Sequence, residues 1–363
     1  MDLNFLNTIL NTHSVSGFEN QAGKLFLDYL LLYVDSIDMD PIGNCYAYLG
    51  NERKGDKSLK FLIEAHIDEI GFQVIYIDEQ GYIYIRKNGG IDVHCIIGTQ
   101  VVIQTSSGEE LLGIIGKKPI HLTAPEERNK NIELHTLWID TGLSPDEVKK
   151  KISIGDVVAW KSNMIYLSDT RISSKGLDNK VGVYIISQVL KRLYSSKING
   201  VQVCGVASVQ EEVGNRGAII CGHKVNPDIA ICIDVDFATD VPDCPKTRFG
   251  DIALGKGVVI HRSIDNTSSI TSLVEKIAKE NNIKYQVSAR TIAVGGTNAV
   301  VLQQTKDGIM TISLGIPCRY MHTPVELCDL DDIESAIELL YHIIIKIHPE
   351  ILIKQTLQSA RKV

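Results

Sequence analysis

The stretch Val201-Gln202-Val203-Cys204-Gly205-Val206-Ala207-Ser208-Val209, followed at once by Gln210-Glu211-Glu212, decides the fold of this sequence. Its nine residues have the length of a strand and are almost all apolar, as expected for a strand covered on both faces of a parallel sheet. Residues 229–233 (Ile-Ala-Ile-Cys-Ile) repeat the pattern and lead into Asp234. The sequence therefore predicts an α/β fold in which buried strands end in acidic residues.

The segments on either side of this stretch alternate between helical and strand patterns. Short apolar strands are expected at residues 58–63 and 309–314. Helices and strands in alternation are typical of a layered α/β/α domain. Apolar residues recur at helical spacing in residues 3–10, 19–34, 179–193, 269–280 and 332–347.

The pattern changes from about residue 71 to residue 160. Short β segments are separated there by glycine turns, which predicts a small barrel or sandwich. One short helix interrupts them, with Ser144 as its cap, Pro145 at its first position and Glu147 completing a capping box. We therefore expect a layered domain of residues 1–68 and 165–350, a β-rich insertion of residues 69–164, and a loose tail of residues 351–363.

Composition excludes several classes of partner. The 363 residues include 44 acidic and 37 basic side chains, a formal net charge of -7, which argues against nucleic acid or an anionic membrane held by bulk charge. No apolar run approaches the ~18 residues that a membrane span needs. The start of the chain, Met1-Asp2-Leu3-Asn4, does not resemble a signal peptide. The eight cysteines form no C-x-x-C pair, so we expect reduced thiols in a cytoplasmic protein.

Acidic residues and histidines fall where predicted strands end or helices begin. Taken singly, each has an ordinary explanation: Asp178 as a helix cap, Glu211 and Glu212 as a solvated pair, a lone histidine as a structural residue. Ligands bind beyond the carboxyl ends of strands in open α/β sheets, however, and buried carboxylates need a cation. The sequence therefore predicts that these groups converge on a metal site. The groups are His66-Ile67-Asp68, Asp178, Glu211-Glu212, Asp234 and His322.

The spacing of His66 and Asp68 suggests a specific contact. Residues i and i+2 of an extended segment point to the same side. Asp68 can therefore accept a hydrogen bond from the ring N–H of His66, which would fix the tautomer of a metal-binding imidazole.

Together these motifs resemble the M42 family of metallo-aminopeptidases, which includes tetrahedral and glutamyl aminopeptidases and some members labelled endoglucanases. The matching stretches occur in the family's order and cover about residues 1–347. They are Ala65–Gly71, Gly116–His121, Leu137–Thr141, Gly176–Gly182, Val209–Gly214, Ile233–Val235, Gly295–Ala299 and Arg319–Glu326.

The resemblance implies an α/β/α metallopeptidase domain that holds two divalent ions, zinc or cobalt or else manganese. By motif, Asp178 bridges the two ions. His66 and Asp234 complete one coordination sphere, and Glu212 and His322 complete the other. The resemblance also implies that the insertion is a barrel-like dimerisation domain and that the protein is a cytoplasmic homo-oligomer, from dimer to dodecamer.

The implied activity is removal of the N-terminal residue from short peptides with a free N-terminus. In this chemistry a metal-bridged hydroxide attacks the peptide bond, Glu211 acts as general base, and Asp68 supports His66. Two positions depart from the family pattern: Asn298 stands where Asp is common, and Asp236 follows Asp234 where Thr is more frequent. We expect Asn298 to affect substrate preference, and Asp236 either to affect the metal or to be a surface residue.

Three other functions are compatible with parts of the pattern. A related metallohydrolase acting on another amide would keep the same metals. An endoglucanase-type glycoside hydrolase needs two acids and commonly stacking aromatic residues, but both tryptophans, Trp138 and Trp160, fall in the insertion. A catalytically silent assembly protein would lack a ligand, and none is missing from this sequence.

Overall fold

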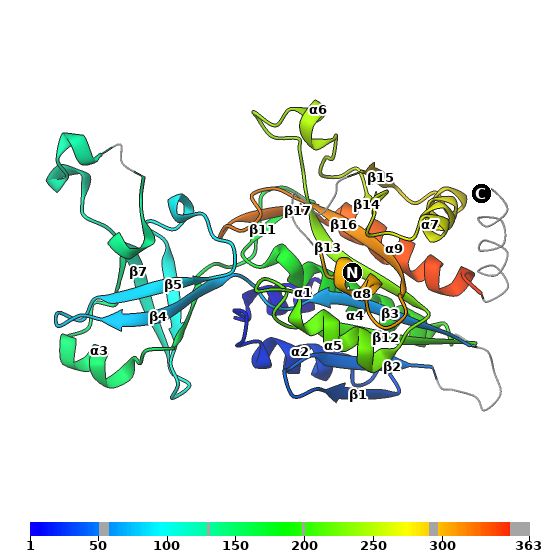
Figure 1. The fold of residues 1–363 in the computed structure, drawn as a ribbon, viewed down its shortest axis with the longest axis horizontal. Coiled ribbons are helices and arrows are strands. Elements are labelled where there is room, and N and C mark those ends of the chain that lie inside the picture. The colour runs from blue at the N-terminus through cyan, green and yellow to red at the C-terminus, as the bar shows by residue number, and fades with distance from the viewer. Residues whose placement is uncertain (51–57, 129–130, 198–199, 290–296, 349–363) are drawn as a thin grey trace.

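The computed structural model describes residues 1–50, 58–128, 131–197, 200–289 and 297–348 of the chain. The tail predicted at residues 351–363 lies outside this part. Figure 1 shows two units side by side, a layered α/β unit and a smaller β barrel. None of the described helices is both long and apolar enough to cross a bilayer.

The layered unit is built on one mixed eight-stranded sheet, which confirms the predicted α/β class. Its strand order is β1-β2-β12-β3-β13-β16-β14-β15, and the four central strands from β12 to β16 run parallel. Strand β2 pairs antiparallel with β12, and β14 pairs antiparallel with β16, so the centre of the sheet is parallel as expected but the strands flanking it run the other way. The strands are β1 Ser36–Met39, β2 Cys45–Leu49, β3 Leu59–His66, β12 Val201–Ser208, β13 Ile229–Phe237, β14 Val258–His261, β15 Tyr285–Ser288 and β16 Met310–Cys318.

Helices cover both faces of this sheet because its central strands bury side chains on both sides. Phe61 and Ile63 of β3 pack into the core of one face, and Leu62 packs into the core of the other. The first face is covered by α1 Leu3–Asn11, α2 Asn20–Leu30, α4 Leu177–Ser195, α7 Ser268–Glu280 and α9 Leu330–Lys346. The second is covered by α5 Arg216–Val225 and α8 Asn298–Gln303. A short helix, α6 Lys246–Phe249, projects from the layered unit (Figure 1).

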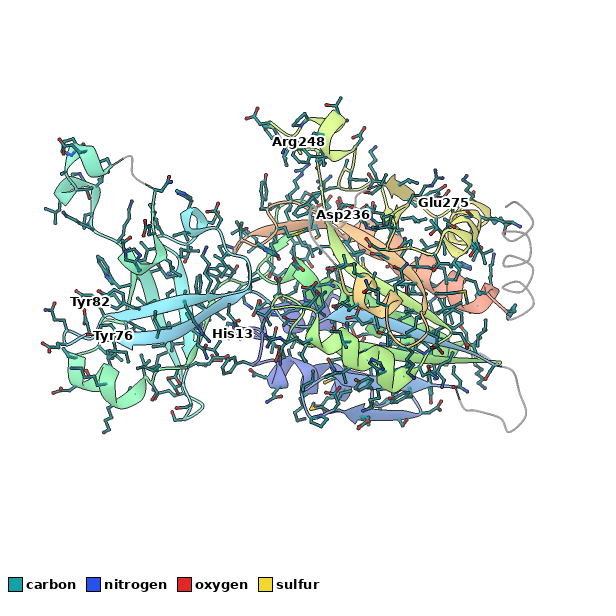
Figure 2. The ribbon with its side chains drawn as sticks, in the orientation of Figure 1. His13, Tyr76, Tyr82, Asp236, Arg248 and Glu275 are labelled. Carbon is teal, nitrogen blue, oxygen red and sulfur yellow. The ribbon has the colours of Figure 1, made fainter. Side chains whose placement is uncertain are left out.

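The inserted unit is a closed six-stranded barrel with its own apolar core, so of the two predicted forms the chain adopts the barrel. Its first and last strands pair with each other, with Phe72 opposite Val158. Helix α3 Pro145–Lys151 begins with the predicted capping box of Ser144 and Glu147. Figure 2 shows Tyr76 and Tyr82 in the barrel and His13 near its junction with the layered unit. In barrel order the strands are β4 Gly71–Ile77, β5 Ile83–Asn88, β8 Trp138–Asp140, β7 Glu110–Gly116, β6 Gln100–Gln104 and β9 Val157–Trp160.

A small three-stranded sheet brings two distant loops together. Strand β11 leads into helix α4, and β17 follows the loop that carries His322. The two strands pair antiparallel, with Ser174 opposite Glu326. Its strands are β10 Ile165–Tyr166, β11 Arg171–Ser174 and β17 Glu326–Asp329. Short 3-10 turns in the barrel unit are η1 Val93–Cys95, η2 Ile120–Leu122, η3 Pro125–Glu127 and η4 Leu134–Thr136.

Candidate metal centre

The predicted acidic residues and histidines meet at the carboxyl ends of the central strands. His66 is the last residue of β3, Asp234 lies near the end of β13, and His322 follows β16. These groups line a cavity of about 490 Å³. Its lining consists of His66, Asp178, Glu211, Glu212, Asp234 and His322 together with Gly214, Asn215, Val235, Phe237, Thr297 and Met321.

Asp178 lies between the two histidines and presents one oxygen to each. Its Oδ1 is 3.2 Å from Nε2 of His66, and its Oδ2 is 3.3 Å from Nε2 of His322. The same Nε2 of His66 lies 3.5 Å from Asp234, and that of His322 lies 3.4 Å from Glu212. Two clusters of nitrogen and oxygen ligands therefore share the Asp178 carboxylate.

The donor set fits divalent transition metals. Ligand atoms lie within 4.8 Å of one another in His66, Asp178 and Asp234, and likewise in Asp178, Glu212 and His322. Imidazole nitrogen and carboxylate oxygen are the ligands of zinc, and imidazole also suits other first-row metals. Glu211 forms a third such cluster with His66 and Glu212, so it too lies within reach of the centre.

Electrostatics also indicate that the cluster needs positive charge. Burial raises the pKa of Glu211 well above its usual range, and it raises the pKa values of Glu212 and Asp234 as well. Burial alone would lower the pKa of His322, but its contacts with Asp178 and Glu212 raise it to about 11. Protons are thus drawn onto the site when no cation compensates the carboxylates, which is the behaviour of a cation-binding cluster.

The second ring nitrogen of each histidine faces a backbone carbonyl. Nδ1 of His66 lies 3.1 Å from the carbonyl oxygen of Asp68, and Nδ1 of His322 lies 2.6 Å from that of Gly90. An N–H on Nδ1 donates to these oxygens and leaves Nε2 with its lone pair toward the cavity, as metal binding requires. The Asp68 carboxylate itself lies 3.5 Å from the His66 ring, farther than the hydrogen bond that the sequence suggested.

The Asp68 carboxylate instead holds the loop after β12. Its oxygens accept hydrogen bonds from the backbone N–H groups of Glu211 at 3.0 Å and Glu212 at 3.2 Å. A third bond comes from the Ser16 hydroxyl at 2.6 Å. Asp68 is fully buried, so these donors satisfy its charge and fix the backbone from which both glutamates project.

Glu326 is a site residue for which the sequence predicted no role. It is buried in β17 and accepts hydrogen bonds from the backbone N–H of Asp178 at 3.0 Å and of His322 at 2.9 Å. One carboxylate therefore ties together two of the proposed ligands. In the sequence Glu326 stands between the apolar Val325 and Leu327 and closes the matching stretch Arg319–Glu326, but neither observation indicates what it contacts.

The two departures from the family pattern have different surroundings. Asn298 is buried beside the site, and its Oδ1 accepts a hydrogen bond from Asn215 at 2.9 Å. Asp236 is buried rather than on the surface, and one of its oxygens lies 3.9 Å from Nε2 of His261. Figure 2 shows Asp236 in the layered unit, and it is not among the residues that line the cavity.

Comparison with known proteins agrees with this geometry. A model of the M42 glutamyl aminopeptidase family matches residues 43–339. The lysyl aminopeptidase of Pyrococcus furiosus is 30% identical over 96% of this chain and 98% of its own. A TET aminopeptidase from a marine sediment thaumarchaeon has a TM-score of 0.90 at 29% identity, covering 97% of this chain and 99% of its own. The TET1 peptidase of Pyrococcus horikoshii, which can assemble into a tetrahedron or a large octahedral shell, has a TM-score of 0.84 at 29% identity, with 95% and 99% covered.

Proposed function

This chain belongs to the M42 glutamyl aminopeptidase family and is a peptide hydrolase, and from that premise we propose that it is a two-metal exopeptidase. One ion would be held by His66, Asp178 and Asp234, and the other by Asp178, Glu212 and His322. The observation that carries this proposal is the position of Asp178, whose two oxygens each face a different histidine. Zinc or cobalt suits these ligands best, and manganese is the next candidate.

Divalent ions bound at this centre would lower the pKa of water from about 15.7 toward 7 and polarise the scissile carbonyl. The residues of the chain supply the remaining steps. Glu211 takes a proton from the attacking water and returns it to the leaving amine. Burial raises the pKa of its carboxyl, in the direction that a base working near neutral pH requires.

Asp68 acts on this step through the backbone. Its hydrogen bonds to the N–H groups of Glu211 and Glu212 keep both side chains aimed into the cavity. Both glutamates line the cavity from the turn that follows β12, so one can bind an ion while the other faces the water. Asp68 is therefore a positioning residue rather than a group that touches substrate.

The charge of the cavity favours a peptide with a free N-terminus. Its described lining includes four carboxylates, and no lysine or arginine belongs to it. An ammonium group is attracted to such a cleft. The substrates we propose are short peptides, bound with the terminal amine among these acids and the first side chain toward Val235, Phe237 and Met321.

We also propose that the barrel mediates a homo-oligomer, from dimer to dodecamer. Leu112 and Ile114 on strand β7 are more than half exposed, and they border a hollow that also contains Trp138. Exposed apolar groups gathered in one place are typical of protein interfaces. Assembly of the Pyrococcus horikoshii relative into shells supports this proposal.

A glycoside hydrolase is disfavoured because Trp138 and Trp160 lie in the barrel and neither lines the cavity, which leaves a sugar without a tryptophan to stack on.

A reducing, cytoplasmic location is supported by six buried cysteines, all with free thiols.

The decisive test compares Glu211→Gln with Asp178→Asn on a panel of aminoacyl p-nitroanilides. Metal-stripped enzyme is reloaded with zinc, cobalt, manganese or magnesium, and bound metal is counted by mass spectrometry. Glu211→Gln should keep its metal and lose about 10²- to 10⁴-fold in kcat. Asp178→Asn should lose metal as well as activity, because both clusters share that carboxylate. Metal loss with unchanged residual activity in Glu211→Gln would contradict the roles we assign.

A further inference from the structure

We propose that Asn215 and Asn298 are positioning residues that link Glu211 to a buried carboxylate, Glu64, through an unbroken chain of hydrogen bonds. This inference rests on the proposed role of Glu211 as general base. It assigns a task to three polar residues that bind no metal in the proposed mechanism. These hydrogen bonds hold one oxygen of Glu211 in place, so that its other oxygen is free to meet the reacting water.

The links are continuous from the cavity to the centre of the sheet. Asn215 Nδ2 donates to Glu211 Oε1 at 3.0 Å and to Asn298 Oδ1 at 2.9 Å. Asn298 Nδ2 donates to Glu64 Oε1 at 2.6 Å and lies 3.3 Å from the Ser208 hydroxyl. That hydroxyl also donates to Glu64 Oε1. Glu64 and Asn298 are almost completely buried, at 1% and 3% exposure.

The direction of these bonds requires an amide at position 298. Its oxygen must accept from Asn215 while its nitrogen donates to Glu64, and no other side chain of this size does both. An aspartate there could still accept from Asn215, but its second oxygen would face the Glu64 carboxylate. Two carboxylates at that distance in a buried environment either repel each other or hold a proton between them, and both outcomes disturb the hydrogen bonds that Asn298 makes. Asn298 and Glu64 are therefore a matched pair.

The chain joins the base to the strand that supplies a metal ligand. Glu64 and His66 are two residues apart on β3 and point to the same face of the sheet. Ser208 lies on the neighbouring strand, opposite His66 in the parallel register. The hydrogen bonds that end at Glu64 thus anchor the side chain of Glu211 to β3, the same strand that positions His66. A base is effective only when its geometry is fixed relative to the reacting atoms, which is what this arrangement provides.

The test exchanges the two groups of the matched pair. Asn298→Asp alone should lower kcat by about 10- to 100-fold, as loss of an outer-shell partner commonly does, with bound metal and KM changed little. Glu64→Gln combined with Asn298→Asp restores one donor facing one carboxylate, and its kcat should recover to within about threefold of wild type. A purely structural role would lower the melting temperature or the metal content of Asn298→Asp together with kcat, whereas a positioning role lowers kcat alone.

Asn215→Gly tests the other end of the chain without risk to folding. Asn215 has a φ of 55°, a conformation that glycine adopts freely, so the variant removes only the side chain. Its kcat should also fall by about tenfold or more. The matched control for Asn298→Asp is Asn266→Asp. Like Asn298, Asn266 is buried, donates through its amide nitrogen and accepts through its amide oxygen (from the Ser313 N–H), but it is not among the residues that line the cavity. Its kcat should not change.

The outcomes separate this inference from the function on which it rests. Wild-type kcat in Asn215→Gly, or no recovery in the doubly exchanged enzyme, would overturn the inference while Glu211→Gln remained inactive. An active Glu211→Gln would instead overturn the proposed function. If Asn298→Asp fails to fold, recovery of both folding and kcat by the added Glu64→Gln still supports the pair.

Discussion

His322 donates its Nδ1 hydrogen to the carbonyl oxygen of Gly90 across 2.6 Å, although 232 positions separate the two residues. Gly90 follows strand β5 of the barrel, whereas His322 lies in the layered unit. The bond fixes the tautomer in which Nε2 faces Asp178 and Glu212. The inserted unit therefore contributes directly to the orientation of a proposed metal ligand.

Gly90→Ala should weaken the ion held by His322. A Cβ at Gly90 would lie 3.2 Å from Nδ1 of that ring, so the imidazole or the barrel segment must shift. Loss of such an orienting contact typically costs about 10- to 100-fold in metal affinity. Calorimetric titration of stripped protein with zinc should show one weakened site and one unchanged site.

Gly116→Ala is the matched control for that experiment. Its Cβ would meet Trp138 Nε1 at the same 3.2 Å, but within the barrel and away from the cavity. Zinc affinity should be unchanged in this variant. Equal zinc binding in both alanine variants would show that the Gly90 contact does not orient His322.

The sequence pattern predicted that the proposed ligands would lie close together because most of them stand at or just after the ends of apolar strands. Glu211 and Glu212 follow the buried strand β12, and Asp234 lies toward the end of β13. The carboxyl ends of neighbouring parallel strands must share one edge of the sheet. Gly90 could not be found this way, since its role depends on how the barrel docks and not on any local pattern. Glu326 was missed for a similar reason, because its partners are backbone groups of two distant loops.

The strands at the edges of the sheet are the part of the fold that the sequence pattern did not predict. Strands β1, β2, β14 and β15 are only four or five residues long and carry no continuous apolar run comparable to 201–209. Of these, β2 and β14 pair with the longer central strands β12 and β16, and β1 and β15 pair with β2 and β14 in turn. The sequence therefore indicated the parallel centre and left the antiparallel edges unspecified.

Glu69→Gln should destabilise the folded protein strongly. Lys175 Nζ lies 2.8 Å from both oxygens of Glu69, Lys180 Nζ lies 3.1 Å from one of them, and all three side chains are buried. Removing the only carboxylate of this triad leaves two buried lysines without their counterion, at a cost of about 3–5 kcal/mol. Urea denaturation measures the free energy of unfolding.

Asp28→Asn serves as the comparison, because Asp28 forms an exposed ion pair with Lys24. Such surface pairs contribute about 0–1 kcal/mol. Similar losses in both variants would mean that the buried triad contributes no more than a surface pair.

His13 should make the fold sensitive to mild acid. Burial, followed by the charge of Lys175, lowers the pKa of His13 from 6.5 to about 4. The unfolded chain therefore binds a proton before the folded one does, so stability falls as the pH drops from about 6.5 to about 4. At lower pH, stability depends instead on Glu69. Burial alone would raise the pKa of this carboxyl, but the charges of Lys175 and Lys180 lower it to about 2.

His13→Gln removes the first of these effects. Melting temperatures measured at half-unit steps from pH 7 to pH 4 should decline less in the variant than in wild type. The corresponding difference in the free energy of unfolding is at most about 3 kcal/mol. Parallel decline of both proteins would assign the acid sensitivity to other groups.

Leu112→Asp with Ile114→Asp should dissociate the proposed oligomer. These side chains are 63% and 52% exposed, and charges placed on them would oppose burial in an interface. Light scattering after gel filtration should report a smaller particle than wild type, with circular dichroism unchanged. Leu32→Asp, at a position 75% exposed on the layered unit, controls for added surface charge. An unchanged mass in the double variant would place the contact elsewhere.

The pairing of Phe72 with Val158 has a consequence for how the chain folds. Strand β3 must find β12 although the intervening sequence runs from residue 67 to residue 200, and the entropy of closing a loop rises with its length. Once the barrel has closed, its two ends lie side by side, and the effective length of that loop is much shorter. Two of the barrel pairings, β4 with β5 and β6 with β7, are local antiparallel hairpins that can form early. Closure of the inserted barrel would then bring the strands that precede it and the strands that follow it close enough to pair in the layered unit.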